Sequence, residues 1–174
     1  MKQIWAPWRA EYIHGQRLSR CIFCKEYSKD NKRGLVLYKG DFAAVMMNKF
    51  PYNNGHLLVY PWKHTSSLEN MDKEEILELF KLIKLSVSIL KKEMNPGGFN
   101  IGMNLGKDAG AGIEEHLHFH IVPRWNGDTN FMSVIDEIRV LPEHLESTYN
   151  KLHPHFQKLK ISADSGKSGT EIHE

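Results

Sequence analysis

Three histidines that alternate with apolar residues are the feature that most constrains what this chain can fold into. His116, His118 and His120 are separated by Leu117 and Phe119. Successive side chains of a β-strand point to opposite faces, so an extended segment places the three imidazoles on one face and the apolar residues on the other. Groups that titrate near neutral pH are costly to crowd together unless they bind a metal, a phosphate or one another. An edge strand with three solvent-facing histidines is the alternative.

The rest of the chain predicts an α+β fold built on an antiparallel sheet. Runs of β-prone residues predict four further strands, over residues 35–38, 42–47, 57–60 and 99–104. Helical spacing predicts a long helix over 72–95, with a core face formed by Ile76, Leu79, Phe80, Ile83, Val87 and Leu90. A last helix is expected near 142–158. The sequence therefore predicts about five strands, one long helix and one or two shorter helices.

Composition limits the classes of partner. The chain has 174 residues, with 23 Lys and Arg against 21 Asp and Glu, so one domain of nearly balanced charge is expected. No basic run of the kind that binds polymeric nucleic acid is present, and no stretch approaches the roughly 20 apolar residues that span a bilayer. The first residues lack the continuous apolar segment of a secretory signal. We therefore expect a cytoplasmic protein without nucleic-acid or membrane partners.

Two cysteines form a second cluster of possible metal ligands. Cys21 and Cys24 are the only cysteines, and they lie within an irregular arm over residues 1–33. In a reducing compartment this spacing is more typical of a metal or redox pair than of a structural disulfide. A closed zinc site needs two more ligands, which histidines can supply. A reduced cysteine pair without metal is the alternative.

A glycine-rich loop leads into the histidine segment. Glycines recur between Gly106 and Gly112, where a tight loop can turn several backbone N–H groups toward one point and bind an anion. A flexible surface turn would use the same glycines. Because the loop leads directly into the histidines, we favour a phosphate site.

These motifs together resemble a known family. Residues 116–122 fit the His-φ-His-φ-His-φ-φ signature, where φ is apolar, of the histidine triad superfamily of nucleotide hydrolases and transferases. The pattern Asn48-x-x-Pro51-x-x-x-Gly55-His56-x-Leu58-Val59 is similar to the family's other landmark, so the resemblance covers roughly residues 20–140. The segments 4–9 and 123–132, with the cysteine pair, resemble the bacterial branch that includes diadenosine tetraphosphate phosphorylases.

The resemblance implies a catalytic domain over 34–140, a C-terminal helix over 141–160 and a tail over 161–174 that we expect to be disordered. It implies a homodimer that needs no organic cofactor and cleaves a small dinucleoside polyphosphate, with diadenosine tetraphosphate the expected substrate. His118 would attack the α-phosphorus to give a nucleotidyl-histidine, which water or phosphate then resolves. The implied partners of His118 in the site are His120 at the α-phosphate or leaving oxygen, Asn48 at the ribose, Asn104 orienting the phosphate or the nucleophile, His56 on the phosphate side, and the amides of Gly110, Ala111 and Gly112.

The resemblance also completes the metal site. By similarity to cysteine-containing members and to hexose-1-phosphate uridylyltransferases, the two further ligands are His64 and His116. A Zn²⁺ ion held by these residues and the two cysteines would fix the N-terminal arm to the sheet beside the nucleophile. Its role would be structural.

One departure from the family pattern leaves the substrate class open. Many members carry Gln-Ser or Gln-Thr shortly before the triad, whereas this chain has Glu114-Glu115. The leaving-group donor is therefore unassigned, and phosphoramidate hydrolysis is less favoured. The other readings of the chain are a nucleotidyltransferase or phosphoramidase acting on another leaving group, and a nucleotide-binding protein without catalysis.

Overall fold

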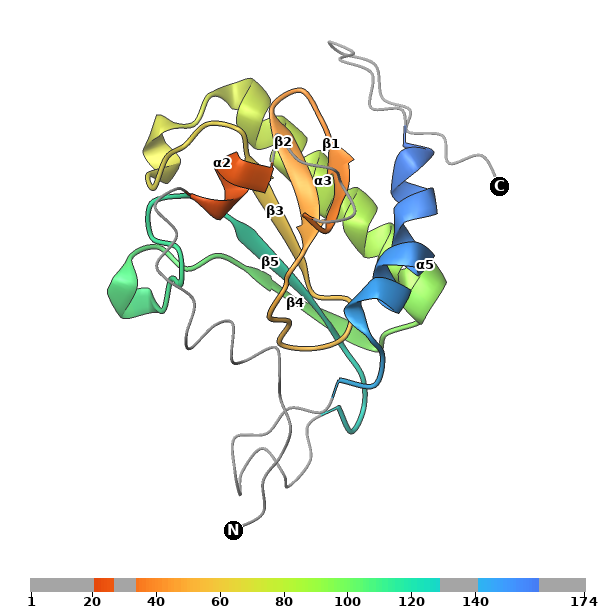
Figure 1. Cartoon of the computed structure of the whole chain (residues 1–174). Coiled ribbons are helices and arrows are strands. Elements are labelled where there is room, and N and C mark those ends of the chain that lie inside the picture. Colours follow the sequence, from red (N-terminus) through yellow and green to blue (C-terminus); the bar gives the residue numbers. More distant parts are fainter. Residues whose placement is uncertain (1–20, 27–33, 129–140, 160–174) are drawn as a thin grey trace.

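Five strands form one antiparallel sheet, as the sequence predicts (Figure 1). The computed structural model describes residues 21–26, 34–128 and 141–159. The strands are β1 (Val36–Lys39), β2 (Ala43–Met47), β3 (Leu57–Pro61), β4 (Gly98–Gly102) and β5 (Phe119–Arg124). Their order in the sheet is β1-β2-β3-β5-β4, and each neighbouring pair is antiparallel. The histidine segment therefore enters the sheet between β3 and the edge strand β4.

In the described part of the chain, three α-helices and two short 3-10 turns accompany the sheet. They are α2 (Ile22–Glu26), α3 (Lys73–Met94), α5 (Leu145–Gln157), η1 (Leu68–Asn70) and η2 (Lys107–Ala109). The long helix α3 begins at a capping box formed by Asp72 and Glu75, and it ends at Asn95 in the left-handed conformation. Both helices predicted from the sequence are present. None of the helices among the described residues is long and apolar enough to span a membrane.

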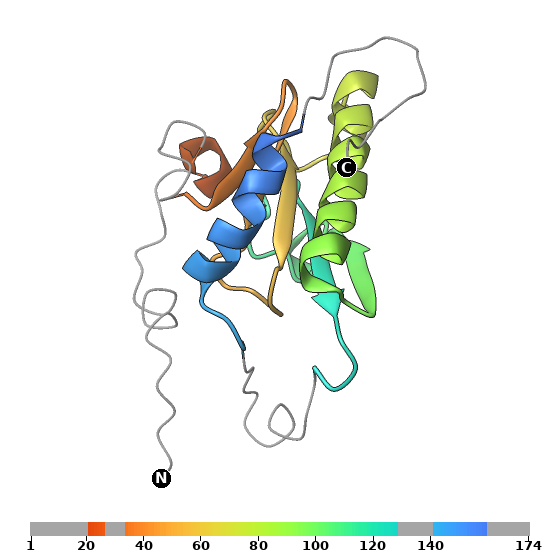
Figure 2. The same ribbon diagram turned by 90° about the vertical axis from the view of Figure 1, so that its right-hand side faces the viewer.

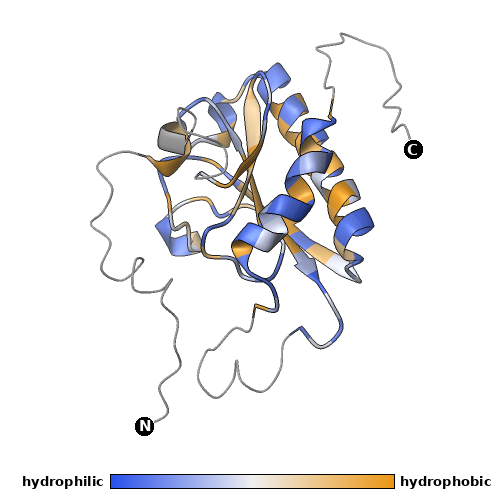
Figure 3. Cartoon of the chain, turned by 45° about the vertical axis from the view of Figure 1, so that its right-hand side comes forward, coloured by the Kyte–Doolittle hydropathy of each residue, from blue (hydrophilic) through white to orange (hydrophobic). Residues whose placement is uncertain are grey.

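The two central strands are buried on both faces. Side chains of β2 alternate between two apolar clusters, with Val45 and Met47 in one and Ala44 and Met46 in the other. The larger cluster lies under α3 and α5, and the smaller one contains Phe23 of α2. Figure 2 shows α2 and α3 on opposite sides of the sheet. Figure 3 shows hydrophobic and hydrophilic colours on different parts of each long helix, as expected when one face of a helix is buried.

The predicted core face of α3 is only partly buried. Leu79, Ile83 and Leu90 lie in the larger cluster, but Ile76 is 36% exposed and Phe80 is 57% exposed. Among the described residues the helix packs chiefly on β2 and β3, and only part of its apolar stripe is buried by this packing. Helical periodicity alone does not separate these two parts of the stripe.

The histidine strand begins later than predicted. β5 starts at Phe119, and His116 and His118 lie just before it, because the N–H of Leu117 donates to the carbonyl of Thr65 (2.8 Å) and not to a neighbouring strand. The predicted sidedness is nevertheless confirmed, since Leu117 and Ile121 lie in the larger cluster. The arm that was predicted to be irregular contains the short helix α2. The rest of that arm, the segment 129–132 and the tail 161–174 lie outside the described residues.

Candidate active site and metal site

The three triad histidines lie on the face of the sheet that α2 covers. His116 and His118 are almost fully buried, with 1% and 6% of their surfaces exposed. Phe23 of α2 contacts both imidazoles, with ring centroids 5.0 Å from each. The rings of His118 and His120 are 4.9 Å apart. Each of the three rings has a different set of partners, and these partners determine what each can do chemically.

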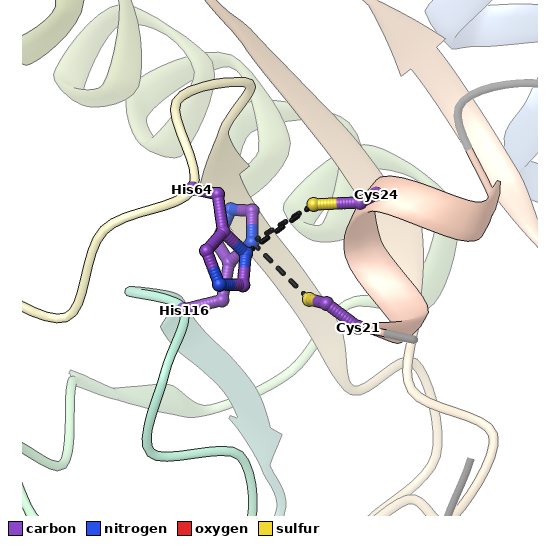
Figure 4. A group of neighbouring side chains, drawn as sticks. All are labelled: Cys21, Cys24, His64 and His116. Carbon is purple, nitrogen blue, oxygen red and sulfur yellow. Dashed lines mark hydrogen bonds between the residues drawn. The ribbon is translucent and has the colours of Figure 1, made fainter. Parts of the chain in front are cut away.

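His116 faces the two cysteines and His64. Its Nε2 is 2.8 Å from the carbonyl oxygen of Pro61, which only accepts, so the proton lies on Nε2 and the lone pair on Nδ1. That Nδ1 is 3.3 Å from the sulfur of Cys21 and 3.7 Å from the sulfur of Cys24. The Nδ1 of His64 is 3.4 Å from the Cys24 sulfur. Figure 4 shows Cys24 of α2 and Cys21, which lies just before that helix, directed toward the two imidazoles.

These four side chains fit a tetrahedral zinc site. Their ligand atoms all lie within 4.8 Å of one another. Zinc bonds of about 2.3 Å to sulfur and about 2.0 Å to nitrogen place tetrahedral ligand atoms roughly 3.3–3.8 Å apart, which matches the S–N distances above. Burial lowers the pKa of His116, which keeps the ring in the neutral form that binds metal. Loss of solvation and the neighbouring Cys21 raise the pKa of the Cys24 thiol, so a bound cation would relieve the crowding of two thiolates.

His118 is fixed in the opposite tautomer. Its Nδ1 is 2.8 Å from the main-chain carbonyl oxygen of His116, so Nδ1 carries the proton and Nε2 keeps its lone pair. Burial lowers the pKa of His118, so the ring is neutral near pH 7. A neutral imidazole with a lone pair on Nε2 is the form that can attack an electrophile.

His120 is the end of a hydrogen-bond chain. The backbone N–H of Tyr52 donates to Nδ1 of His56 (3.0 Å), so the proton of His56 lies on Nε2. That Nε2–H donates to Nδ1 of His120 (2.9 Å), which leaves the proton of His120 on Nε2. Burial and then the neighbouring His118 lower the pKa of His120 to about 4. His120 is therefore a neutral ring that offers an N–H from Nε2.

Two predicted substrate contacts, His56 and Asn48, are linked to His120 through side-chain contacts. His56 is 1% exposed, and its ring nitrogens bond the backbone N–H of Tyr52 and Nδ1 of His120, so it helps to hold the His120 ring. Asn48 accepts the N–H of Phe50 with its side-chain oxygen (2.9 Å), and its amide nitrogen is 3.3 Å from Nδ1 of His56. Gly55 precedes His56 at φ 70°, and a Cβ there would lie 2.7 Å from the sulfur of Met94.

The glycine loop is held by its own hydrogen bonds. The N–H of Gly110 donates to the carbonyl of Lys107 (2.8 Å), and the N–H of Ala111 donates to the carbonyl of Gly106 (3.2 Å). The side-chain amide of Asn104 donates to the carbonyl of Gly110 (3.2 Å). Asn104 therefore fixes the loop, and phosphate binding by these two amides would require them to share or exchange their present bonds. Gly112 is exposed.

Comparison with known proteins identifies the family. The family model described as "HIT domain" matches residues 29–127, which is more than half of the chain. The chain belongs to the HIT family. The histidine triad signature of the sequence analysis is therefore confirmed as a family assignment, and the α+β fold is the one that solved HIT structures share with this chain.

The chain is similar in sequence or structure to several known proteins. The AP-4-A phosphorylase of Mycobacterium tuberculosis is 34% identical over 157 residues, which cover 85% of this chain and 80% of that protein. A hypothetical histidine triad nucleotide-binding protein from Sulfolobus tokodaii has a TM-score of 0.63 at 28% identity, covering 86% of this chain and 100% of that chain. A zinc-bound histidine triad family protein from Mycobacterium smegmatis has a TM-score of 0.61 at 25% identity, covering 79% and 94%.

Two residues of this HIT site were not predicted from the sequence. Phe23 lies between the cysteines and contacts two triad rings, a role that its position inside the Cys-x-x-Cys motif could have suggested. Tyr52 is 48% exposed, and its ring stacks on His120 at 5.7 Å with an interplanar angle of 16°. The signal for Tyr52 is weaker, because an aromatic residue in a turn is usually only a surface residue.

Proposed function

We propose that this HIT protein cleaves dinucleoside polyphosphates, with diadenosine tetraphosphate as the substrate, through a nucleotidyl intermediate on His118. The observation that carries the proposal is a pair of opposite tautomers on adjacent rings. His118 offers a lone pair at Nε2, and His120 offers an N–H at Nε2, with their centroids 4.9 Å apart. The similarity to a protein named AP-4-A phosphorylase supports the choice of substrate.

The two rings support a two-step transfer. Nε2 of His118 forms a bond to the α-phosphorus, and the bond from phosphorus to the bridging oxygen breaks. The departing oxygen takes that electron pair and accepts a hydrogen bond from Nε2–H of His120, which stabilises the negative charge that develops on it. In the second step an oxygen of phosphate or water attacks the phosphorus, and any proton that the attacking group loses passes to solvent. The P–N bond breaks, and its electron pair returns to Nε2 of His118.

Other residues would hold the phosphates around this pair. The glycine loop, with Asn104 fixing it, would supply amide donors to the non-bridging oxygens, and Gly110 and Gly112 are both exposed. Asn48 and His56 would act through the loop over 48–56 and through His120. All of these residues fall within 34–140, the proposed catalytic domain, and the helix within 141–160 packs beside β1.

Product analysis tests the reaction and its acceptor together. Purified protein would be incubated with diadenosine tetraphosphate, with and without inorganic phosphate. ADP plus ATP in the presence of phosphate would show phosphorolysis, and AMP plus ATP would show asymmetric hydrolysis. Absence of any product, with tight nucleotide binding, would contradict the proposal and favour a nucleotide-binding protein.

We also propose that the metal is zinc, held by Cys21, Cys24, His64 and His116. The support is the donor set and its spacing, together with a zinc-bound relative of similar fold. Zinc at this position would bind α2 to the sheet, and ligation by two thiolates suits the reducing cytoplasm that we expect. Elemental analysis of protein purified without added zinc should give one zinc per chain. A value well below one would remove the four-ligand proposal.

We also propose that two copies of the chain form a homodimer through an exposed apolar surface beside β4. Phe80 on α3 is 57% exposed, and its ring lies 5.7 Å from that of Phe119. Ile101 of the edge strand is 47% exposed and pairs with Ile121, so it faces the same side of the sheet. An edge strand flanked by apolar side chains favours pairing with a second chain. Sedimentation equilibrium should give twice the chain mass, and a monomer at micromolar concentration would contradict the proposal.

A further inference from the structure

One side chain links the metal ligands to the proposed nucleophile. Phe23 stands between Cys21 and Cys24 and is fully buried, although α2 has only five residues. Its ring centroid lies 5.0 Å from His118, 5.0 Å from His116 and 4.6 Å from Tyr60. One segment of four residues therefore supplies two candidate metal ligands and a ring that packs against the proposed nucleophile.

His116 forms a second link between the two sites. Its side chain faces the cysteines through Nδ1, while its main-chain carbonyl accepts the Nδ1–H of His118. The contacts that position the His118 ring thus include Phe23 on one side and the backbone of a metal-ligating residue on the other. Since His118 is 6% exposed, its orientation depends mainly on such neighbours and only slightly on solvent.

We propose that Phe23 is a positioning residue for His118, held in place by the metal ligands on either side of it. Packed against the imidazole, Phe23 keeps Nδ1 of His118 on the His116 carbonyl and Nε2 directed at the substrate. The metal site then influences turnover through α2 and without touching the substrate. The inference rests on the proposed role of His118 as nucleophile.

The alternative role for Phe23 is simply to fill the smaller core. A residue that only fills space lowers the stability of the fold but leaves the turnover of folded molecules unchanged. A positioning residue lowers kcat in the folded state, with a smaller effect on KM, because it acts on the geometry of attack. Phe156 provides a matched control, since it is also fully buried but lies in the cluster on the opposite face of the sheet.

The experiment compares Phe23→Ala, Phe23→Leu and Phe156→Ala at a temperature where circular dichroism shows all three to be folded. We expect kcat to fall about 10- to 100-fold in Phe23→Ala, with KM changed by less than about threefold. Phe23→Leu should recover part of this loss, and Phe156→Ala should stay within about twofold of wild type. Wild-type kcat in folded Phe23→Ala would overturn the inference.

A second measurement does not depend on cleavage. Nitrogen-15 NMR of the His118 ring, without substrate and at mildly alkaline pH, should show one tautomer with the proton on Nδ1 in the wild type. Phe23→Ala, and separately Cys24→Ser, should each give a mixture of tautomers. A single Nδ1–H tautomer in both variants would overturn the inference even if the wild type cleaves nothing. Unchanged cleavage in His118→Ala would instead overturn the proposed function, so the two failures are distinguishable.

Discussion

The two ends of the histidine triad both use a histidine side chain, but different partners surround it at each end. At the metal end, His116 is surrounded by side chains from α2 and from the loop after β3, and its ring bonds a backbone carbonyl. At the other end, which we propose faces the phosphates and call the phosphate end, His120 receives a hydrogen bond from His56, which is itself fixed by the backbone of Tyr52. Because Nε2 of His116 bonds an acceptor, its Nδ1 keeps a lone pair that can bind a metal. Because Nδ1 of His120 accepts from a donor, its Nε2 carries the proton and can donate a hydrogen bond.

This comparison shows how a repeated residue takes on unlike roles. Spacing along the strand determines only that the three rings share a face. What each ring can do is decided by the partner of its second nitrogen, and that partner comes from a distant part of the chain: Pro61 for His116, and His56 for His120. Variants that remove these partners should therefore affect the two ends of the triad independently and in different ways.

Replacing the central ring should have the largest effect. His118→Ala removes the proposed nucleophile shared by both ends, so kcat/KM for diadenosine tetraphosphate should fall by about 10⁴-fold or more. The matched control is His144→Ala, because His144 is exposed at the start of α5. Steady-state kinetics on folded, zinc-loaded protein would measure both. Turnover within tenfold of wild type in His118→Ala would contradict the mechanism.

Removing a ligand at the metal end should mainly lower the stability of the fold. Cys24→Ser removes one ligand, so zinc content should drop from one per chain to near zero, and the free energy of unfolding should fall by about 3 kcal/mol. His56→Ala, at the other end, should leave the zinc content unchanged. Elemental analysis and urea unfolding would test this pair. Equal zinc loss in both variants would show that the ends are not independent.

Removing the hydrogen-bond partner of His120 at the phosphate end should mainly lower kcat. His56→Ala removes the hydrogen bond to Nδ1 of His120, so the ring can turn or change tautomer, and kcat should fall about 10- to 100-fold. His56→Gln retains an N–H donor and an acceptor for the Tyr52 amide, so it should keep more activity. If kcat fell equally in His56→Gln and His56→Ala, loss of the hydrogen bond to His120 would not be the cause of the lower turnover.

The smallest effect concerns the support of the loop over 51–55. Glu143 accepts hydrogen bonds from Thr148 and Asn54, and its hydrogen bond to Lys151 is the main reason its pKa lies below the ordinary value of glutamate. A lowered folded pKa stabilises the fold above the unfolded pKa, and this contribution is lost as pH falls through the folded value. Glu143→Gln should cost less than about 1 kcal/mol near neutral pH, because the carboxylate is only partly buried.

Urea unfolding from about pH 7 to about pH 3 would measure this effect. The difference in unfolding free energy between wild type and Glu143→Gln should shrink as pH decreases. A difference that stays constant over this range would show that the ionisation of Glu143 does not contribute.

The fold was largely predictable because it depends on local periodicity. Five strands and the two longer helices follow from alternation and helical spacing, within a few residues at each end. The start of β5 was misplaced because the N–H of Leu117 bonds to Thr65, a contact between distant segments that local patterns do not contain. For the same reason the exposure of Phe80 was missed, since it depends on where α3 crosses the sheet.

The site was predictable as a set of residues but not as a network. The sequence predicted all four metal-site residues that the structure brings together, Cys21 and Cys24 from their spacing and His64 and His116 from the family resemblance. It did not reveal that His56 is buried behind His120, or that Phe23 packs on His118. Both facts depend on which atom of one ring faces which atom of another, and that information appears only after the chain has folded.

The central claim is that partners fix the three triad rings in alternating tautomers, and nitrogen-15 NMR of the histidine rings tests it most directly. With His116, His118 and His120 assigned by single substitution to glutamine, the substrate-free, zinc-loaded protein would be measured at neutral pH. We predict the proton of His118 on Nδ1 and that of His120 on Nε2, with the metal bound to Nδ1 of His116. The same tautomer on His118 and His120, or rapid exchange between tautomers at either ring, would contradict the account.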